Sequence, residues 1–208
     1  VGHAGDLAGH QVSVQANMME RPTVWPAMLA AYEAAAGEDL AGRLLAALDA
    51  AEAEGGDWRG RQSAALLVVS GARSDRPWDE RLYDLRVYDN EAPLVELRRL
   101  LDVKRAVRRI TDVFESGVLF APELDPDGPE LTSALDGLGI AQQTLGDNRE
   151  PSFWSAVLLA KARRFDQARE RLDFASETNP RWPGFLHHVA AAGVLAPDSH
   201  LLQPVAED

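Results

Sequence analysis

The spacing of apolar residues changes along this chain, and strand-like spacing is confined to residues before 89. Residues 10–18 alternate polar with apolar after turn-forming glycines, which predicts a short hairpin-like piece ending near Asn17. Residues 62–70 form a continuous apolar run, typical of a buried central strand, and residues 82–88 alternate again. The last two segments are joined by a polar loop and should pair antiparallel. Because so few strands cannot build two packed sheets, we expect an exposed apolar sheet face or exposed strand edges.

Helical spacing fills most of the remaining chain. It predicts two helices over residues 22–36 and 39–54, packed as a hairpin over a sheet, and a long helix after Pro93. Four shorter helices are expected between residues 131 and 195. The long helix is rich in arginine, but acidic neighbours and the lack of interleaved aromatic residues favour a solvated face over a nucleic-acid site.

The composition excludes several classes of protein. The chain has 208 residues, a net charge of −12 and no cysteine, so it has neither disulfides nor thiolate metal sites. No apolar stretch is long enough to span a membrane, and the acidic charge argues against nucleic-acid and membrane partners. The five histidines lack metal-binding spacing and there is no phosphate-binding loop, so we expect no metal and no cofactor. With no targeting signal in view, the expected location is cytoplasmic.

A stretch rich in proline and glycine, residues 121–129, is the best candidate for a domain boundary. We therefore expect an α+β domain over residues 1–120, a linker over 121–129, a small helical domain over 130–196 and a frayed tail over 197–208.

One polar segment leads directly into the apolar run. Residues 55–66 read Gly-Gly-Asp-Trp-Arg-Gly-Arg-Gln-Ser-Ala-Ala-Leu, which sets Asp57, Arg59, Arg61 and Gln62 at the mouth of a strand. Arginine supplies a forked donor for a substrate carboxylate, and a glycine-rich loop supplies backbone amides. The alternative is structural: Asp57 pairs with Arg59 or Arg61 and braces a tight turn.

This segment resembles the signature of domain-of-unknown-function family 1028, a family assigned to the N-terminal-nucleophile (Ntn) hydrolase superfamily. Residues 14–19, the leucine- and alanine-rich stretch 40–54, and residues 84–100 are similar to other blocks of that family, in the same order. The resemblance implies an amidohydrolase with an αββα sandwich, of which this chain would hold an incomplete, C-terminal part. Asn17, Asp57, Arg59, Arg61 and Gln62 would border the substrate cleft, with Asn17 as an oxyanion or substrate donor and Arg59 or Arg61 as a carboxylate clamp.

The resemblance also has departures. In the superfamily the nucleophile is a Thr, Ser or Cys at a processed N-terminus, whose α-amino group acts as its base. Val1 carries no such group, so we expect the nucleophile-bearing half to be missing and leave the catalytic residues unassigned. Ala16 replaces a family glycine, which implies ordinary backbone angles at that position.

The C-terminal part carries a different pattern. Residues 154–180 are similar to a tetratricopeptide repeat (TPR), although any helical hairpin with Ala and Leu at helical spacing gives much the same pattern. Two functions therefore stay open: an amidohydrolase acting on a small-molecule or peptide amide, or a non-enzymatic binding or scaffold protein that uses its helical domain. Exposed sheet surface would also favour a homo-oligomer.

Overall fold

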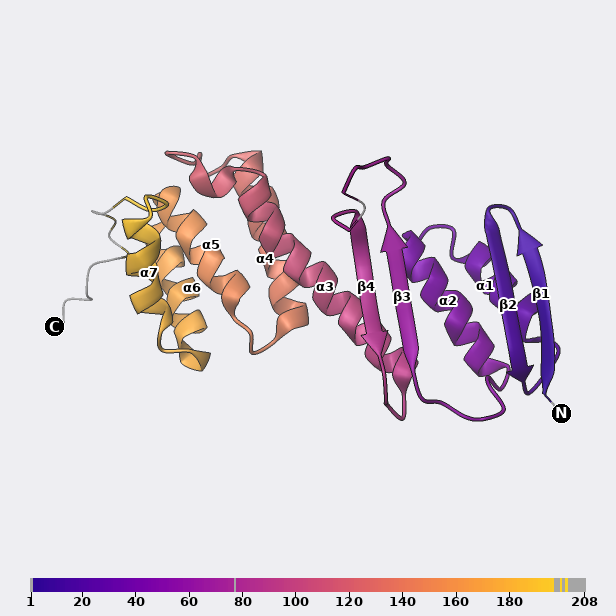
Figure 1. Cartoon of the computed structure of the whole chain (residues 1–208). Helices are drawn as coiled ribbons and strands as arrows, with labels where there is room; N and C mark the ends of the chain where they lie inside the picture. Colours follow the sequence, from indigo (N-terminus) through magenta and orange to yellow (C-terminus); the bar gives the residue numbers. More distant parts are fainter. Residues whose placement is uncertain (1, 77, 197–198, 200, 202–208) are drawn as a thin grey trace. The chain divides into compact units, whose positions relative to one another are not determined.

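The computed structural model describes residues 2–76, 78–196, 199 and 201 of a mixed α+β chain. Its contacts divide the chain into two compact units, Val1–Leu101 and Asp102–Asp208. Each unit has a buried apolar core of its own. The units are described separately below, and Figure 1 labels their elements.

The first unit begins with an antiparallel hairpin of β1 (His3–Gly9) and β2 (Val12–Met19), which confirms the hairpin expected near Asn17. Its register pairs His3 with Met19 but Gly5 with Ala16, so β2 holds one extra residue. Met18 takes a left-handed conformation with φ of 54° in this interval, whereas Ala16 does not. Such a bulge bends the strand and redirects neighbouring side chains.

Helix α1 (Val24–Ala34) packs against this hairpin. A Cβ atom at Gly5 would lie 2.4 Å from the Trp25 ring, so glycine is required for the close approach of strand and helix. Helix α2 (Leu40–Ala53) packs against α1 and begins where Asp39 Oδ1 accepts a hydrogen bond from the Gly42 amide at 2.8 Å. The predicted helical hairpin is therefore confirmed.

A second hairpin pairs β3 (Ala64–Val69) antiparallel with β4 (Arg81–Val87), as the sequence predicts. The prediction that β3 is buried on both faces is wrong. Leu66 and Val68 are buried, but the alternating residues Leu67 and Val69 are 57% and 53% exposed. One face of the hairpin packs on helices and no described element covers the other, so an apolar sheet face is exposed as expected.

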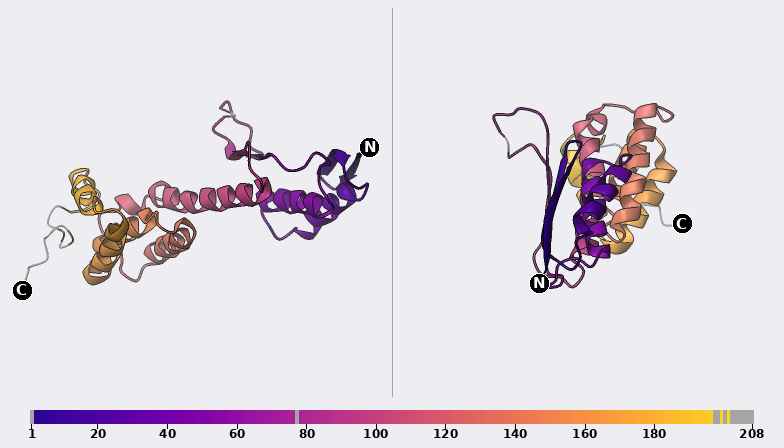
Figure 2. Two further views of the ribbon diagram at one scale, coloured as in Figure 1. Left: turned by 90° about the horizontal axis from the view of Figure 1, so that it is seen from below. Right: turned by 90° about the vertical axis from the view of Figure 1, so that its right-hand side faces the viewer.

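Both hairpins lie in one layer over the helices. Leu66 and Val68 of β3 share a core with Leu45 of α2 and with Leu97 and Leu101 of α3 (Pro93–Glu115). Figures 1 and 2 show the two hairpins on the same side of α1 and α2, with α2 uncovered between β2 and β3. The described part of this unit is thus a two-layer arrangement whose sheet is interrupted.

The arginine-rich face of α3 is paired with carboxylates. Arg98 contacts Asp49 of α2, Arg99 Nη2 lies 2.7 Å from Glu96 Oε1, and Arg108 Nε lies 2.8 Å from Asp112 Oδ1. These contacts match the solvated, ion-paired face expected from the sequence.

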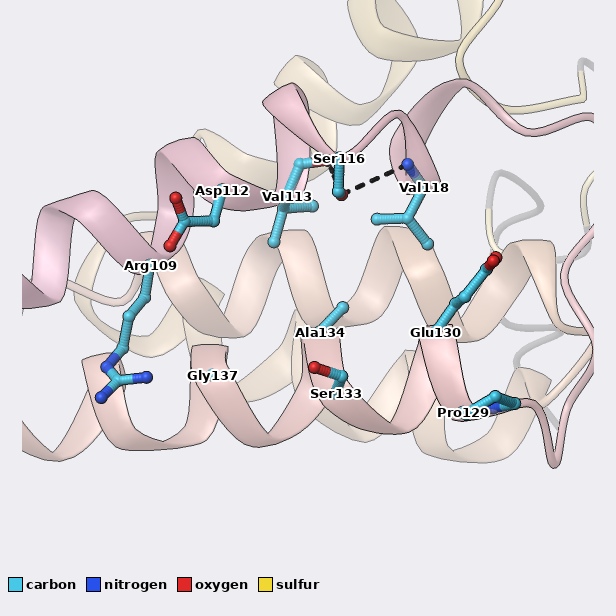
Figure 3. A pocket seen from close by; sticks show the side chains of 10 residues that line it. All are labelled: Arg109, Asp112, Val113, Ser116, Val118, Pro129, Glu130, Ser133, Ala134 and Gly137. Carbon is cyan, nitrogen blue, oxygen red and sulfur yellow. Dashed lines mark hydrogen bonds between the residues drawn. The ribbon is translucent and has the colours of Figure 1, made fainter. Parts of the chain in front are cut away.

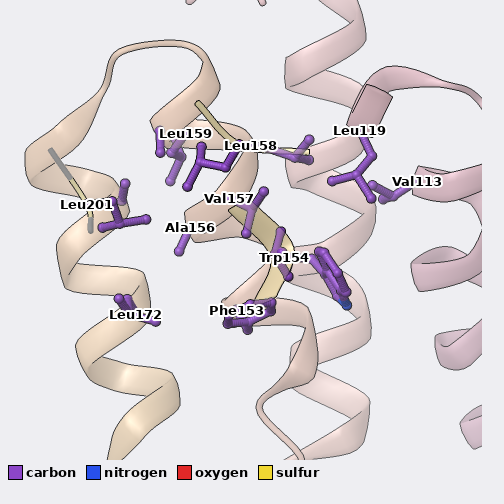
Figure 4. Close-up of a cluster of buried hydrophobic side chains, with 14 of the residues drawn as sticks. Val113, Leu119, Phe153, Trp154, Ala156, Val157, Leu158, Leu159, Leu172 and Leu201 are labelled. Carbon is purple, nitrogen blue, oxygen red and sulfur yellow. The ribbon is translucent and has the colours of Figure 1, made fainter. Parts of the chain in front are cut away.

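The second unit is all-helical. After η1 (Val118–Phe120) come α4 (Pro129–Leu145), α5 (Glu150–Lys161), α6 (Phe165–Thr178) and α7 (Trp182–Ala191). Residues 151–160 are all buried, because α5 lies at the centre of the unit and is contacted from several sides (Figure 4). Trp154 packs edge-on against Phe114 at 4.8 Å between ring centroids, and Phe153 stacks on Trp182 at 4.6 Å.

Segment 121–129, which we expected to be a linker, is not a free connection between two domains. Leu124 of segment 121–129 is buried in the core of the second unit, and the contacts divide instead after Leu101, inside α3. Within the expected tail 197–208, Ser199 and Leu201 are buried against the same unit, and the other tail residues lie outside the described part of the chain.

Candidate functional site

The candidate site is built on a tight glycine turn after α2. Gly55 and Gly56 have φ of 109° and 65°, and the Gly56 amide donates to the carbonyl of Ala51 at 3.0 Å. A Cβ atom at Gly55 would lie 2.5 Å from Glu20 Oε2, so both the backbone angle and the crowding require glycine there. The turn fixes where the next residues leave α2.

Those next residues pair with the end of β2. The Glu20 amide donates to the Gly56 carbonyl at 3.0 Å, and the Trp58 amide donates to the Met18 carbonyl at 2.8 Å. Met19 and Asp57 form an antiparallel bridge between these bonds. The segment 56–58 therefore forms an isolated bridge on the edge of β2 that faces away from β1.

Asp57 and Arg59 form a closed pair within the loop. Asp57 Oδ1 accepts from the Arg59 amide at 2.8 Å and from Arg59 Nε at 2.9 Å, and Asp57 Oδ2 lies 2.6 Å from Arg59 Nη2. These side-chain and backbone hydrogen bonds from Arg59 lower the pKa of Asp57 from 3.8 to about 2. Asp57 is thus ionised at neutral pH, and part of the Arg59 fork is engaged in bracing the turn.

Arg61 and Gln62 continue the loop toward β3. Arg61 Nε donates to a carboxylate oxygen of Glu52 in the last turn of α2. Of the two arginines considered as partners of Asp57, the structure therefore pairs it with Arg59. The carbonyl of Gln62 accepts from the Asn90 amide at 3.0 Å, which ties the start of β3 to the segment after β4. The side chains of Arg61 and Gln62 are exposed.

The loop borders a cleft of about 610 Å³ that is lined by Met19, Leu48, Ala51, Glu52, Gly56, Asp57, Arg59, Gly60, Arg61, Gln62, Ser63, Pro93 and Leu94. The structure thus brings together Asp57, Arg59, Arg61 and Gln62, four of the five residues singled out in the sequence. Asn17 lines a neighbouring groove of about 380 Å³ instead, which shares Met19, Leu48 and Ala51 with the cleft.

Sequence reasoning missed two polar groups of the cleft, Glu52 and Ser63. Glu52 belongs to the helix before the turn, and its position three residues ahead of the glycine pair is the only sequence signal that points to it. The cleft therefore presents arginine and amide donors beside two carboxylates and one hydroxyl. Such a set can bind a carboxylate or an amide group.

A second cavity lies within the all-helical unit. It has a volume of about 520 Å³ between the C-terminal half of α3 and α4 (Figure 3). Val113 of α3 faces the small residues Ser133, Ala134 and Gly137 of α4, and charged side chains, among them Arg109 and Glu130, stand at its ends.

No group of three or more His, Cys, Asp or Glu side chains in the described residues is arranged to hold a metal ion. Nor does any helix among these residues have the length and apolar character needed to cross a membrane.

Residues 1–97 match the model of a family of unknown function, DUF1028. The match covers both hairpins, the turn and the cleft-lining residues. Neither the curated proteins nor the solved structures contain a match to this chain.

Proposed function

We propose that this chain acts in amide-bond hydrolysis as part of an Ntn-hydrolase-like enzyme, with residues 2–101 contributing to an αββα sandwich. The observation that carries the proposal is the position of the family-like loop, whose Asp57, Arg59, Arg61 and Gln62 all line one cleft of about 610 Å³. A cleft of this size is ample for a small acyl amide or a few peptide residues.

The described residues serve binding and orientation in this proposal. The Asp57–Arg59 pair holds the loop in its shape, since Arg59 contacts both carboxylate oxygens. Arg61 and Gln62 are exposed at the cleft and offer donors to a substrate carboxylate or carbonyl. Asn17 offers an amide donor from the adjacent groove. The nucleophile is left unassigned, and in an enzyme of this type it is a terminal residue activated by its own amino group.

The decisive experiment is to read the DNA upstream of the Val1 codon and to determine the N-terminus of the natural protein by mass spectrometry. The protein is then incubated with a library of acyl amides and short peptides. A mature Thr, Ser or Cys terminus together with amide hydrolysis supports the proposal. A natural start at residue 1 without hydrolysis overturns it.

A substitution pair then tests the cleft. Arg61→Ala should raise KM about tenfold or more, since a charge-assisted hydrogen bond to substrate contributes about 1.5–3 kcal/mol. Arg76→Ala removes an arginine that is paired with Asp79 outside the cleft and serves as the control. Equal KM values for the two variants would remove Arg61 from the site.

A second function, a non-enzymatic binding or scaffold protein, is favoured by the cavity between α3 and α4. Its small α4 residues would admit the side chains of a partner protein that binds the helical domain. The substitution Gly137→Leu fills the cavity and distinguishes between the two proposed functions. It should leave amide hydrolysis unchanged in an enzyme and abolish partner binding in a scaffold.

A further inference from the structure

A pocket of about 200 Å³ lies where α4, α5 and α6 meet, within the all-helical unit. Leucine side chains form part of its wall: Leu135 and Leu138 come from α4, and Leu159 comes from α5. Polar residues of all three helices complete the lining. An apolar recess with a few polar groups placed in it has the usual composition of a small-ligand site.

Helix α5 contributes two hydroxyl groups to this pocket. Residues 151–160 are all buried, and apart from the Trp154 indole their only polar side chains are Ser152 and Ser155. These serines are 2% and 7% exposed. Residues three apart lie on the same face of a helix, and both serines line the pocket. The hydroxyl groups of an otherwise apolar segment therefore occur where α5 meets the pocket.

The hydrogen atoms of both hydroxyl groups are already engaged. Ser152 Oγ donates to Gln142 Oε1 at 2.8 Å. Gln142 is held in this orientation because its Nε2 donates to the Gly146 carbonyl at 2.7 Å. Ser155 Oγ donates to the Pro151 carbonyl at 2.8 Å. Each serine oxygen keeps acceptor capacity that no described residue fills, so these two groups suit an ammonium or another N–H donor.

Groups of both charges lie at the mouth of the pocket, on α6. Glu170 and Arg171 are exposed residues of the lining, and neither forms an ion pair with another residue in the described part of the chain. Gln167 Oε1 accepts from Arg164 Nε at 2.6 Å, which leaves the amide hydrogens of Gln167 available. The mouth thus offers a carboxylate to a cation, and arginine and amide donors to a carboxylate.

We propose that this pocket binds a free α-amino acid, whose ammonium contacts the two serine oxygens and Glu170 and whose carboxylate contacts Arg171 and Gln167. A water molecule occupies about 30 Å³ in the liquid, so 200 Å³ has room for roughly seven non-hydrogen atoms, the size of alanine or serine. The leucine wall would contact the side chain of the amino acid. This site goes beyond the proposed hydrolysis, because none of its residues belongs to the cleft of the first unit.

The test is isothermal titration calorimetry of the full chain with L-alanine, L-serine and three further probes. Alaninamide keeps the ammonium but lacks the carboxylate, N-acetylalanine keeps the carboxylate but lacks the ammonium, and L-tryptophan is too large for the pocket. We expect alanine and serine to bind, each blocked analogue to bind at least tenfold more weakly than alanine, and tryptophan not to bind. Absence of alanine and serine binding, or equal binding of alanine and either blocked analogue, overturns the proposal.

Substitutions at the mouth assign each end of the ligand. Arg171→Gln should weaken alanine binding by more than tenfold and leave alaninamide, which has no carboxylate, unchanged. Glu170→Gln should weaken alanine binding likewise and leave N-acetylalanine, which has no ammonium, unchanged. Both residues are exposed, so the fold should be retained, and circular dichroism checks this.

Two matched controls alter charges that do not line this pocket. Arg181→Gln and Asp173→Asn make the same types of change at exposed positions, and both should leave alanine binding unchanged. If Arg171→Gln bound alanine as tightly as Arg181→Gln does, the amino acid would bind elsewhere and the assigned site would be wrong.

Discussion

At the residue scale, the bracing pair of Asp57 and Arg59 makes a prediction about pH. The folded-state pKa of Asp57 is about 2, below its ordinary value of 3.8, so the ionised carboxylate stabilises the folded first unit. That contribution is fully present above about pH 4 and is lost as the pH falls toward 2. Because Arg59 is largely exposed, the contribution is about 1 kcal/mol or less.

Urea unfolding of the wild type and of Asp57→Asn should therefore give a constant difference in the free energy of unfolding between pH 5 and 8. The difference should shrink below pH 4. Arg59→Gln, which removes the other partner, should reproduce both results. A difference that grows as the pH falls would contradict the assigned pairing.

A second residue-scale prediction concerns the contact between β1 and α1. Gly5→Ala forces a methyl group against the Trp25 ring, which lies 2.4 Å from the ideal Cβ position, and it should lower the free energy of unfolding by about 1–3 kcal/mol. Gly37→Ala is the matched control, since no atom lies within 4 Å of the Cβ position there. Thermal melts of the two variants check the difference, and equal melting temperatures would refute the close approach.

At the element scale, much of the secondary structure follows from the sequence. Alternation predicted β4, helical spacing predicted α1 and α2, and the loop between the apolar runs predicted the antiparallel pairing of β3 with β4. Exposure was harder to predict. A continuous apolar run such as that of β3 indicates two covered faces, but which faces are covered depends on partners that local sequence does not specify.

In the candidate site, too, some contacts could be predicted from the sequence and others could not. The Asp57–Arg59 pair spans two residues, so sequence alone could propose it. The contact of Arg61 with Glu52 depends on how the glycine turn folds back against α2, which local spacing does not reveal. Asn17 was grouped with the other four residues by resemblance alone. In the structure it lies within the bulged interval of β2 and lines the neighbouring groove.

The exposed face of β3 gives the element-scale prediction. Leu67 and Val69 expose more than half of their side-chain surface next to one another on the same face. Such a face favours self-association, so the sedimentation coefficient of the wild type should rise with concentration. Leu67→Thr combined with Val69→Thr should abolish this rise, because threonine keeps the β-branched shape while making the face polar.

The control for that experiment is Val95→Thr, which alters a side chain of α3 that is 70% exposed. It should leave the concentration dependence unchanged. A wild type that sediments as a monomer at all concentrations would show that the exposed face of β3 does not drive association.

At the scale of the whole molecule, the division of the chain depends on burial more than on composition. Segment 121–129 has the proline and glycine content of a linker, yet Leu124 within it is buried in the core of the second unit. Helix α3 continues through the point where the contacts divide and carries no sequence break there. Composition therefore marks a turn at 121–129, whereas the boundary follows from which core each apolar side chain joins.

The two cores have no buried residue in common, which predicts separable stability. Leu45 and Leu138 are both fully buried, one in each core, so replacing either with alanine should cost about 2–5 kcal/mol through lost contacts and a residual cavity. Hydrogen exchange followed by mass spectrometry resolves where that loss falls. Leu45→Ala should speed exchange in α2 and β3 and spare α5, while Leu138→Ala should speed exchange in α4 and α5 and spare β3. If either variant lowered protection equally in both units, the chain would unfold as one cooperative body and the division after Leu101 would have no energetic meaning.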